Sequence, residues 1–496
     1  MGKIFQEIVR NARLHEIKPA IVDDAGTSIT FRQLHEHVLS LSDFFESKGF
    51  GHKGSRKTTR VALAISDELL NIYSVLALNK LGCEIVVLNH KLMNLQFNDA
   101  INAAEAEVLI HDGCDEVLAL QIDAPKINVN HAIEFKSIGN EICDRNESQN
   151  YKNNTPFLIT MSSGSTGKPK PIIFSEKNKI DRAYQSARLY NVLSADVILC
   201  ASPFHHSLGQ RLTFLSILLG STLVILRKFT SKNWLRVVSQ HNVTFTIAVS
   251  SHLHSIKSYL LKNDFPNSLR CLVSSSAGID LETKKTLFRN PNIDFYEIYG
   301  ASEVAVVTNL DKEGALQKLE SVGKPCDGVS VEICDPNGLS CAADQVGEIC
   351  VSSRLISPGY INRPMSVHKI DGKKFFRTGD QGFLDPDGFL HFMGRSDDMI
   401  ITGGMNFFPS DVVNVISKHE QVIEVEIIGL PDPILGQIVA AVVAVTRGED
   451  VESDLRRLCR SKLAPFQRPV KYRFVSNIPK LDSGKTDRLA LSDFFS

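Results

Sequence analysis

Short apolar runs alternate with longer amphipathic segments over the first half of the chain. Eight runs of six or seven residues, rich in Val, Ile and Leu, are typical of buried β-strands. They are RVALAIS (60–66), CEIVVLN (83–89), AEVLIHD (106–112), PFLITM (156–161), DVILCAS (196–202), STLVIL (221–226), FTIAVS (245–250) and LRCLVSS (269–275). Two other segments, 30–49 and 68–82, carry apolar residues at helical spacing. This alternation predicts an α/β fold with largely parallel sheets.

The pattern changes twice further along the chain. Between about 323 and 396 the apolar runs are short and separated by turns, as in VSVEICDPNG and GEICVSS, which predicts a small β-rich subdomain. The residues after it mix strand-like runs with helical segments at 410–419 and 452–463. We therefore predict a large N-terminal domain, 1–396, made of two α/β lobes plus the β-rich subdomain. The remaining residues, 397–496, are enough for a separate α+β domain.

Composition and charge exclude several classes of protein. The 496 residues are 43% hydrophobic and 22% charged, which is ordinary for a globular protein. Lys and Arg (55) balance Asp and Glu (56) without a basic block, so nucleic acid is not expected as a partner. The strongest apolar stretch, 212–226, is shorter than the ~20 residues that cross a bilayer. The N-terminus lacks the apolar core of a secretion signal, and we expect a cytoplasmic protein without a transmembrane segment.

The ten cysteines are scattered, and no two have the Cys-x-x-Cys spacing of a zinc or redox site. Several lie in apolar, strand-like runs. We expect buried free thiols in a reducing compartment and no metal cluster among them.

The stretch LITMSSGSTGKPKPIIF, 158–174, places small hydroxyl residues and glycines between an apolar run and two lysines. Such a loop can fold its amide groups around an anion, so phosphate is the first candidate ligand. Only two residues separate Gly164 from Gly167, and Pro169 follows Lys168, so it is not the phosphate loop of nucleoside triphosphatases. Taken alone, the stretch could also be a flexible linker.

Four further motifs follow in order, and they decide between these interpretations: YEIYGASEV (296–304), FRTGDQGFLDPDG (376–388), GRSDDMIITGGMNFFPSDVV (394–413) and IPKLDSGKTDR (478–488). Together with the loop, they resemble the adenylate-forming superfamily of acyl-CoA synthetases, nonribosomal adenylation domains and beetle luciferases. The sequences of these motifs are most similar to those of acyl- and aryl-CoA ligases. The resemblance implies that a carboxylic acid attacks the α-phosphorus of ATP, that pyrophosphate leaves, and that a thiol captures the acyl-adenylate.

The resemblance also implies roles for the loop and for YGASE. The loop would wrap the β- and γ-phosphates through Ser162, Ser163, Gly164, Ser165, Thr166, Gly167 and Lys168. Tyr299 would stack on adenine, with Gly300 beside it in the nucleotide site, Ser302 would contact the α-phosphate, and Glu303 would bring Mg²⁺ to the phosphates. The stretch SSSAG aligns with the adenine-side loop of relatives, which adds Ser276, Ala277 and Gly278 as candidate contacts.

The later motifs would complete the nucleotide site. Asp380 matches the acid that accepts hydrogen bonds from both ribose hydroxyls, and Arg395 would add a ribose or phosphate contact. Asp397 matches the hinge about which a mobile C-terminal domain turns. Lys485 would bridge the substrate carboxylate and the α-phosphate, because its ammonium reduces the repulsion between two anions. If other residues replaced the lysine or the glutamate of these motifs, the protein would be expected only to bind its ligands. Lys485 and Glu303 are both present, which favours an enzyme.

The acid and the acceptor are less closely defined. In SPFHHSLGQ (202–210) the aspartate typical of amino-acid-activating relatives is absent, and His206 would act as a gate at the acyl pocket, unless the two histidines merely cap a strand. Gly403 and Gly404 would line the tunnel for the pantetheine arm. Phe466 and Arg468 are candidate contacts to the nucleotide end of coenzyme A. The leading acceptor is coenzyme A, the alternative is the phosphopantetheine of a separate acyl carrier protein, and a luciferase is a third option.

Overall fold

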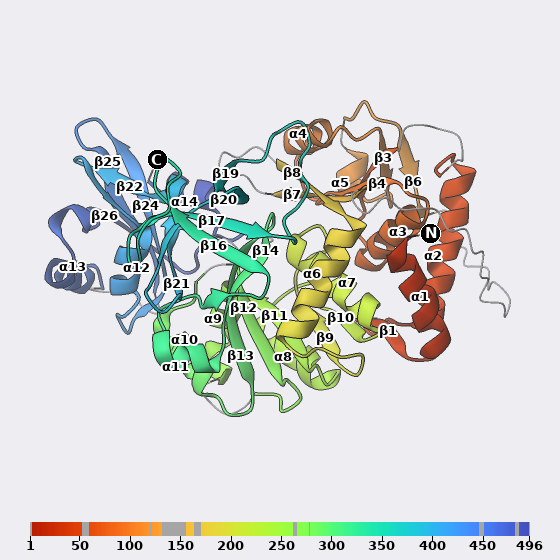
Figure 1. Ribbon diagram of the computed structural model, residues 1–496, viewed down its shortest axis with the longest axis horizontal. Helices are drawn as coiled ribbons and strands as arrows, with labels where there is room; N and C mark the ends of the chain where they lie inside the picture. The colour runs from red at the N-terminus through yellow and green to blue at the C-terminus, as the bar shows by residue number, and fades with distance from the viewer. Residues whose placement is uncertain are drawn as a thin grey trace.

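The computed structural model of the chain describes residues 2–51, 59–119, 121–130, 155–162, 170–260, 265–276, 278–445, 451–481 and 486–495. Within these ranges the strands form four sheets (Figure 1). The α/β architecture predicted from the sequence is confirmed, and each of the eight apolar runs forms a strand.

Two large sheets dominate the N-terminal part. The first has the order β15 (Lys324–Pro325), β14 (Ala305–Leu310), β13 (Asp294–Ala301), β12 (Cys271–Ser275), β11 (Phe245–Val249), β9 (Val197–Cys200), β10 (Thr222–Ile225), β1 (Pro19–Asp23) and β2 (Ser28–Thr30). The second has the order β18 (Gly359–Tyr360), β8 (Lys170–Ser175), β7 (Pro156–Ser162), β4 (Glu84–Val87), β3 (Arg60–Ala64), β5 (Val108–His111) and β6 (Lys126–Asn128). Central pairs such as β11 with β12 and β3 with β4 are parallel, whereas β13–β14 and β7–β8 are antiparallel.

Helices fill the space between the two sheets and cover their other faces. One core cluster joins both sheets to α1 (Lys3–Leu14), α2 (Phe31–Ser47), α3 (Glu68–Lys80), α6 (Glu176–Leu189) and α7 (Ser207–Leu219). A second cluster packs the nine-stranded sheet against α8 (Ser231–Gln240), α9 (Ser250–Leu260), α10 (Leu281–Arg289) and α11 (Lys312–Lys318). A third packs the seven-stranded sheet against α4 (Asn94–Ala104) and α5 (Asp115–Leu118). Strands buried on both faces explain the continuous apolar runs of the sequence.

Local sequence determines where the helices begin. The Thr30 hydroxyl caps α2 by accepting a hydrogen bond from the Gln33 amide, and the Gln33 side chain in turn accepts one from the Thr30 amide. Ser175 forms the same kind of capping box at α6. Helix α6 therefore begins directly after β8, the strand that leaves the predicted phosphate loop. The six residues of β8 separate the start of the helix from that loop.

The β-rich subdomain and the C-terminal region follow. The first is an antiparallel sheet of β16 (Val329–Cys334), β17 (Gly347–Ser353), β20 (Lys373–Leu384) and β19 (Val367–Ile370), with β21 (Leu390–Arg395) paired to β20. The second contains η2 (Ser396–Asp398), β22 (Ile400–Thr402), β23 (Met405–Phe407), α12 (Pro409–Ile416), β24 (Val422–Asp432), β25 (Gly436–Val445), α13 (Val451–Lys462), η3 (Pro465–Gln467), β26 (Lys471–Val475) and α14 (Arg488–Asp493).

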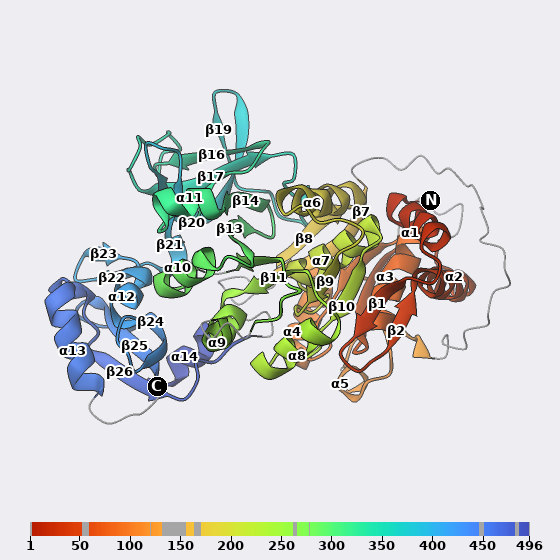
Figure 2. The same ribbon diagram turned by 90° about the horizontal axis from the view of Figure 1, so that it is seen from below.

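Figure 2 shows the blue C-terminal elements as a separate body next to the teal β-rich sheet, with the two α/β lobes on the other side. The C-terminal sheet has its own core cluster, which α12 and α13 complete. No helix among the described residues is long and apolar enough to span a membrane.

Candidate active site

The predicted phosphate loop joins two antiparallel strands. Strand β7 ends at Ser162, which pairs with Lys170 at the start of β8, so the loop is the connection of a β-hairpin. The hairpin lies between β4 and β18 in the seven-stranded sheet. The other six predicted phosphate contacts, Ser163 to Lys168, lie outside the described residues.

The YGASE motif forms a tight turn between β13 and β14. A Cβ at Gly300 would lie 2.0 Å from the carbonyl oxygen of Ala305, so only glycine fits at this position. The strand register shifts between Tyr299 and Gly300. The turn therefore presents Ser302 and Glu303 directly after the end of β13, the strand that carries Tyr299.

Three predicted nucleotide contacts from distant parts of the sequence meet in one place. The Tyr299 hydroxyl donates a hydrogen bond to Oδ2 of Asp380 (2.7 Å), and Nε of Arg395 lies 3.5 Å from Oδ1 of the same carboxylate. Asp380 and Arg395 are direct partners of β20 and β21. Burial, followed by the neighbouring Asp380 carboxylate, raises the pKa of Tyr299 well above its usual value. Tyr299 is therefore a neutral donor that orients Asp380.

The ring of Tyr299 has an aromatic neighbour that the sequence did not indicate. Phe392 of β21 lies with its ring centroid 5.6 Å from that of Tyr299, at a tilt of 34°, and it is 38% exposed. A partly exposed aromatic residue beside the predicted adenine contact enlarges the apolar surface available to a base.

Glu303 is held by a second residue that sequence reasoning missed. The Tyr360 hydroxyl donates a hydrogen bond to Oε1 of Glu303 (2.8 Å), while Oε2 has no partner among the described residues. Burial raises the pKa of Tyr360, so it remains a donor at neutral pH. A carboxylate oriented through one oxygen, with the other oxygen available, suits the hard-ligand preference of Mg²⁺.

A buried polar group lies behind the phosphate hairpin. Oε1 of Gln210 in α7 accepts hydrogen bonds from Thr160 Oγ1 in β7 (2.8 Å) and from Lys179 Nζ in α6 (2.6 Å). Lys179 is only 5% exposed, and burial lowers its pKa well below the usual value. These contacts fix the hairpin strand to the two helices that flank it.

The paired histidines lie at the start of α7. His206 is the N-cap residue of this helix without a side-chain cap bond, and its ring centroid lies 4.2 Å from that of His205. The pKa of His205 is lowered well below its usual value by burial, and then by the neighbouring His206, His90 and Lys91. This end of the helix is therefore rich in basic side chains.

The adenine-side loop follows β12. Ser276 has a positive φ of 80°, which marks a sharp change of chain direction. A Cβ at Gly278 would meet nothing within 4 Å, so the backbone there is accessible. Ala277 lies outside the described residues.

Lys485 also lies outside the described residues, but both ends of its loop are anchored. Lys480 and Thr486 form an antiparallel bridge. Thr486 donates a hydrogen bond to Glu426, and the Lys480 ammonium contacts both Glu424 and Thr486. Lys480 and Thr486, which lie on either side of the undescribed residues, are therefore both held against β24.

The hinge region contacts the helix that follows this loop. Asp397 lies in η2, between β21 and β22, and its neighbour Asp398 forms an ion pair with Arg488 at the start of α14. Burial raises the pKa of Asp398, and Arg488 opposes that rise. An ion pair therefore joins two of the motifs singled out in the sequence, 394–413 and 478–488.

The predicted acceptor residues occupy separate places in the C-terminal region. Gly403 and Gly404 form the tip of the β22–β23 hairpin with positive φ values of 57° and 80°. Phe466 packs on Phe407, with ring centroids 5.9 Å apart. Arg468 donates hydrogen bonds to the carbonyls of Leu463 and Arg460, which closes the end of α13. The structure thus shows a local stabilising role for Arg468.

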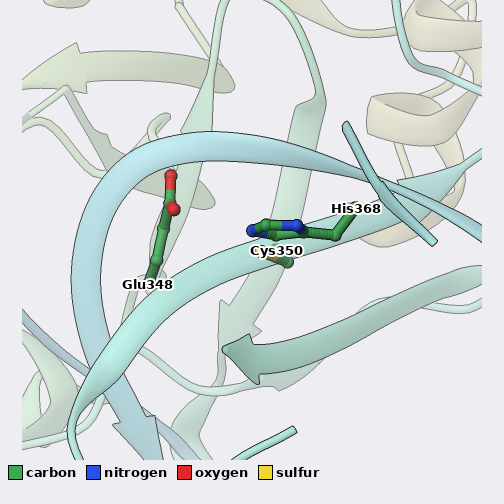
Figure 3. A group of neighbouring side chains, drawn as sticks. All are labelled: Glu348, Cys350 and His368. Carbon is green, nitrogen blue, oxygen red and sulfur yellow. The ribbon is translucent and has the colours of Figure 1, made fainter. Parts of the chain in front are cut away.

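A second group of potential metal ligands lies in the β-rich sheet. Figure 3 shows Glu348 and Cys350 of β17 near His368 of β19, and one ligand atom from each lies within 4.8 Å of the others. The Glu348 carboxylate already accepts hydrogen bonds from Arg377 Nε (2.7 Å) and from the Gly379 amide (3.1 Å). A cation there would have to displace the guanidinium. The ion pair instead braces the part of β20 that carries Asp380.

The sequence matches the AMP-binding enzyme family over residues 8–361 and the AMP-binding enzyme C-terminal domain over residues 412–485. The chain therefore belongs to the AMP-binding enzyme family. It is an ATP-dependent acid–thiol ligase, which activates a carboxylic acid as its acyl-adenylate before the acyl group passes to a thiol.

Individual relatives cover the chain almost completely. The 2-succinylbenzoate–CoA ligase of Geobacillus sp. (strain WCH70) is 28% identical over 480 residues, which span 96% of this chain and 95% of that protein. The O-succinylbenzoate coenzyme A synthetase of Bacillus subtilis, in complex with ATP and magnesium ion, is 25% identical and superimposes with a TM-score of 0.82, covering 98% of this chain and 99% of that one. A double mutant of the B. subtilis enzyme, bound to the product analogue OSB-NCoA, is 24% identical and gives a TM-score of 0.69, covering 99% and 98%.

Proposed function

We propose that the protein is an AMP-forming acid–CoA ligase whose acid is an aryl acid with a second anionic group, the class to which 2-succinylbenzoate belongs. The observation that carries this proposal is the meeting of Tyr299, Asp380 and Arg395 beside the turn of Glu303, in a chain that matches 2-succinylbenzoate–CoA ligases along nearly its whole length. Lys91, which is near enough to His205 to lower the pKa of that imidazole, supplies a positive charge suited to a second carboxylate of the acid.

In the first step, the carboxylate oxygen of the acid attacks the α-phosphorus of ATP. The bond between the α-phosphorus and the bridging oxygen breaks, and pyrophosphate leaves with that electron pair. Asp380 accepts hydrogen bonds from the ribose, Tyr299 keeps Asp380 in place, and the phosphate hairpin receives the leaving group. Lys485 reduces the repulsion between the two anions as they approach.

Glu303 holds the magnesium ion in this proposal. When bound, Mg²⁺ supplies positive charge to the phosphate oxygens. The chain contributes the position of the carboxylate, because Tyr360 orients Oε1 and leaves Oε2 for a ligand.

In the second step, the thiol sulfur of coenzyme A attacks the acyl carbon. The bond from that carbon to the AMP oxygen breaks, and the thiol proton is released. Lys485 must leave the site before the thiol enters, which requires residues 397–496 to turn as one domain about Asp397 against residues 1–396. The chain superimposes with a TM-score of 0.82 on the B. subtilis enzyme with ATP and magnesium ion, and of 0.69 on its double mutant with a product analogue, a difference that supports a change of domain arrangement between the two steps.

Coenzyme A is favoured over the other acceptors considered. The matched relatives are named as CoA ligases, which gives no support to loading of a carrier protein or to a luciferase. We further propose that the enzyme works in the cytoplasm, because the nine described cysteines are all free thiols, as in a reducing compartment.

A pyrophosphate-release assay over a panel of carboxylic acids tests this function. With ATP and Mg²⁺, we expect release with 2-succinylbenzoate and weaker release with benzoate, which lacks the second carboxylate. Repeating the assay with coenzyme A and with a holo-carrier protein should give acyl transfer to coenzyme A alone. Equal rates of pyrophosphate release with benzoate and with 2-succinylbenzoate would contradict the proposal that the acid carries a second anionic group. If no acid caused release of pyrophosphate, the assignment of the protein as an adenylate-forming enzyme would be contradicted.

A further inference from the structure

A single buried guanidinium in α6 connects the turn of Glu303 to the rest of the molecule. Arg182 is 4% exposed. Its Nη1 donates a hydrogen bond to the carbonyl oxygen of Ser302 (2.6 Å), and its Nη2 donates to that of Glu303 (2.7 Å). Its Nε and Nη2 also reach the carbonyl oxygen of Leu355, at 3.0 and 2.6 Å. The rigid fork of arginine thus fixes two consecutive backbone carbonyls of the turn and a third from another loop.

Arg182 links the two groups that hold Glu303, one at its backbone carbonyl and one at its side-chain carboxylate. The Glu303 carbonyl also accepts a hydrogen bond from the Ser357 amide (2.8 Å). Leu355 and Ser357 lie on the segment that leads into β18, where Tyr360 orients the Glu303 carboxylate. The guanidinium therefore joins the backbone of Glu303 to the loop that carries the partner of its side chain.

The charge at this position is costly for stability. Among the described residues, no carboxylate lies within ion-pair distance of Arg182. The Glu303 carboxylate is near enough to raise the pKa of Arg182 slightly, against the lowering that burial causes. Burial, followed by the neighbouring Arg211, lowers the pKa of Arg182 to about 9, so it is still a cation at neutral pH. The ring of Phe174 in β8 lies 4.6 Å from the guanidinium carbon. Since apolar residues often replace buried charges without loss of stability, these contacts suggest that Arg182 serves the site.

We propose that Arg182 is a positioning residue for the adenylation step. It holds the Ser302–Glu303 turn against α6, so that the metal-binding carboxylate of Glu303 keeps a fixed position in the site. This inference rests on the proposed function, because it assigns Glu303 to the metal.

Arg182→Lys tests the proposal, because lysine keeps the charge but cannot reach several carbonyls at once. The full-length variant is assayed in two half-reactions: acid-dependent pyrophosphate release over a range of Mg²⁺ concentrations, and thiolysis of a supplied acyl-adenylate by coenzyme A. We expect adenylation to fall roughly 10- to 100-fold, with a higher Mg²⁺ concentration for half-maximal rate and thiolysis within about twofold of the wild type. Arg188→Lys, the same change at an exposed position of α6, should leave both half-reactions unchanged.

A second variant guards against a failure of Arg182→Lys to fold. Phe174→Leu loosens the ring contact while leaving the arginine, and we expect the same selective loss of adenylation, smaller in size. Equal loss of both half-reactions in a folded variant, or no loss in either, would overturn the proposal. An inactive wild type would instead contradict the proposed function, so the two failures are distinguishable.

Discussion

Lys485→Ala is expected to abolish acyl-adenylate formation while largely sparing thiolysis of a supplied acyl-adenylate. An ammonium about 4 Å from an anion, at an effective dielectric of about 20, contributes roughly 4 kcal/mol before desolvation. Its loss therefore costs roughly two to three orders of magnitude in rate. The anchoring of Thr486 to Glu426 and of Lys480 to Glu424 keeps the loop ends in place in the variant.

Separate measurement of the two half-reactions distinguishes this role from a general loss of stability. Pyrophosphate release reports the first step, and formation of acyl-CoA from synthetic acyl-adenylate reports the second. Lys471→Ala, on the exposed side of β26, is the matched control and should change neither. A comparable loss of both half-reactions in Lys485→Ala would remove the lysine from its assigned role.

Glu303→Gln should have the second largest effect. The change keeps the shape and the partner Tyr360 but removes the negative charge that holds a divalent cation. We expect the adenylation rate to fall roughly 100-fold and the Mg²⁺ concentration needed for half-maximal rate to increase. Titration of Mg²⁺ at saturating ATP measures both quantities.

Glu313→Gln in α11 is a suitable control, since its side chain is exposed. If Glu303→Gln kept the Mg²⁺ dependence of the wild type and changed only the affinity for the acid, Glu303 would contact substrate rather than metal. The metal assignment would then be wrong.

Most of the fold could be predicted from the sequence, because the apolar runs that form the strands are local patterns. Runs such as RVALAIS and FTIAVS are buried on both faces of a sheet, and they form β3 and β11. The meeting of Tyr299 and Asp380 could be expected only through the resemblance of their motifs, because 81 positions separate them.

The residues that the sequence did not reveal act through tertiary contacts. Arg182 lies in a helix whose sequence, EKNKIDRAYQSARL, is typical of a solvated charged face, and its neighbour Lys177 does form an exposed ion pair with Asp181. Only the packing of α6 shows that Arg182 points to the carbonyls of a distant turn. Tyr360 belongs to a two-residue strand, too short for a periodic pattern to reveal.

The most direct test of the central claim is a crystal structure of the protein with a nonhydrolysable acyl-sulfamoyl adenosine. We predict that the adenine lies against Tyr299, that both ribose hydroxyls donate hydrogen bonds to Asp380, and that the sulfamoyl group faces Lys485. Binding of this analogue elsewhere, with the Tyr299–Asp380 hydrogen bond and its surroundings unchanged, would contradict the assignment of the active site.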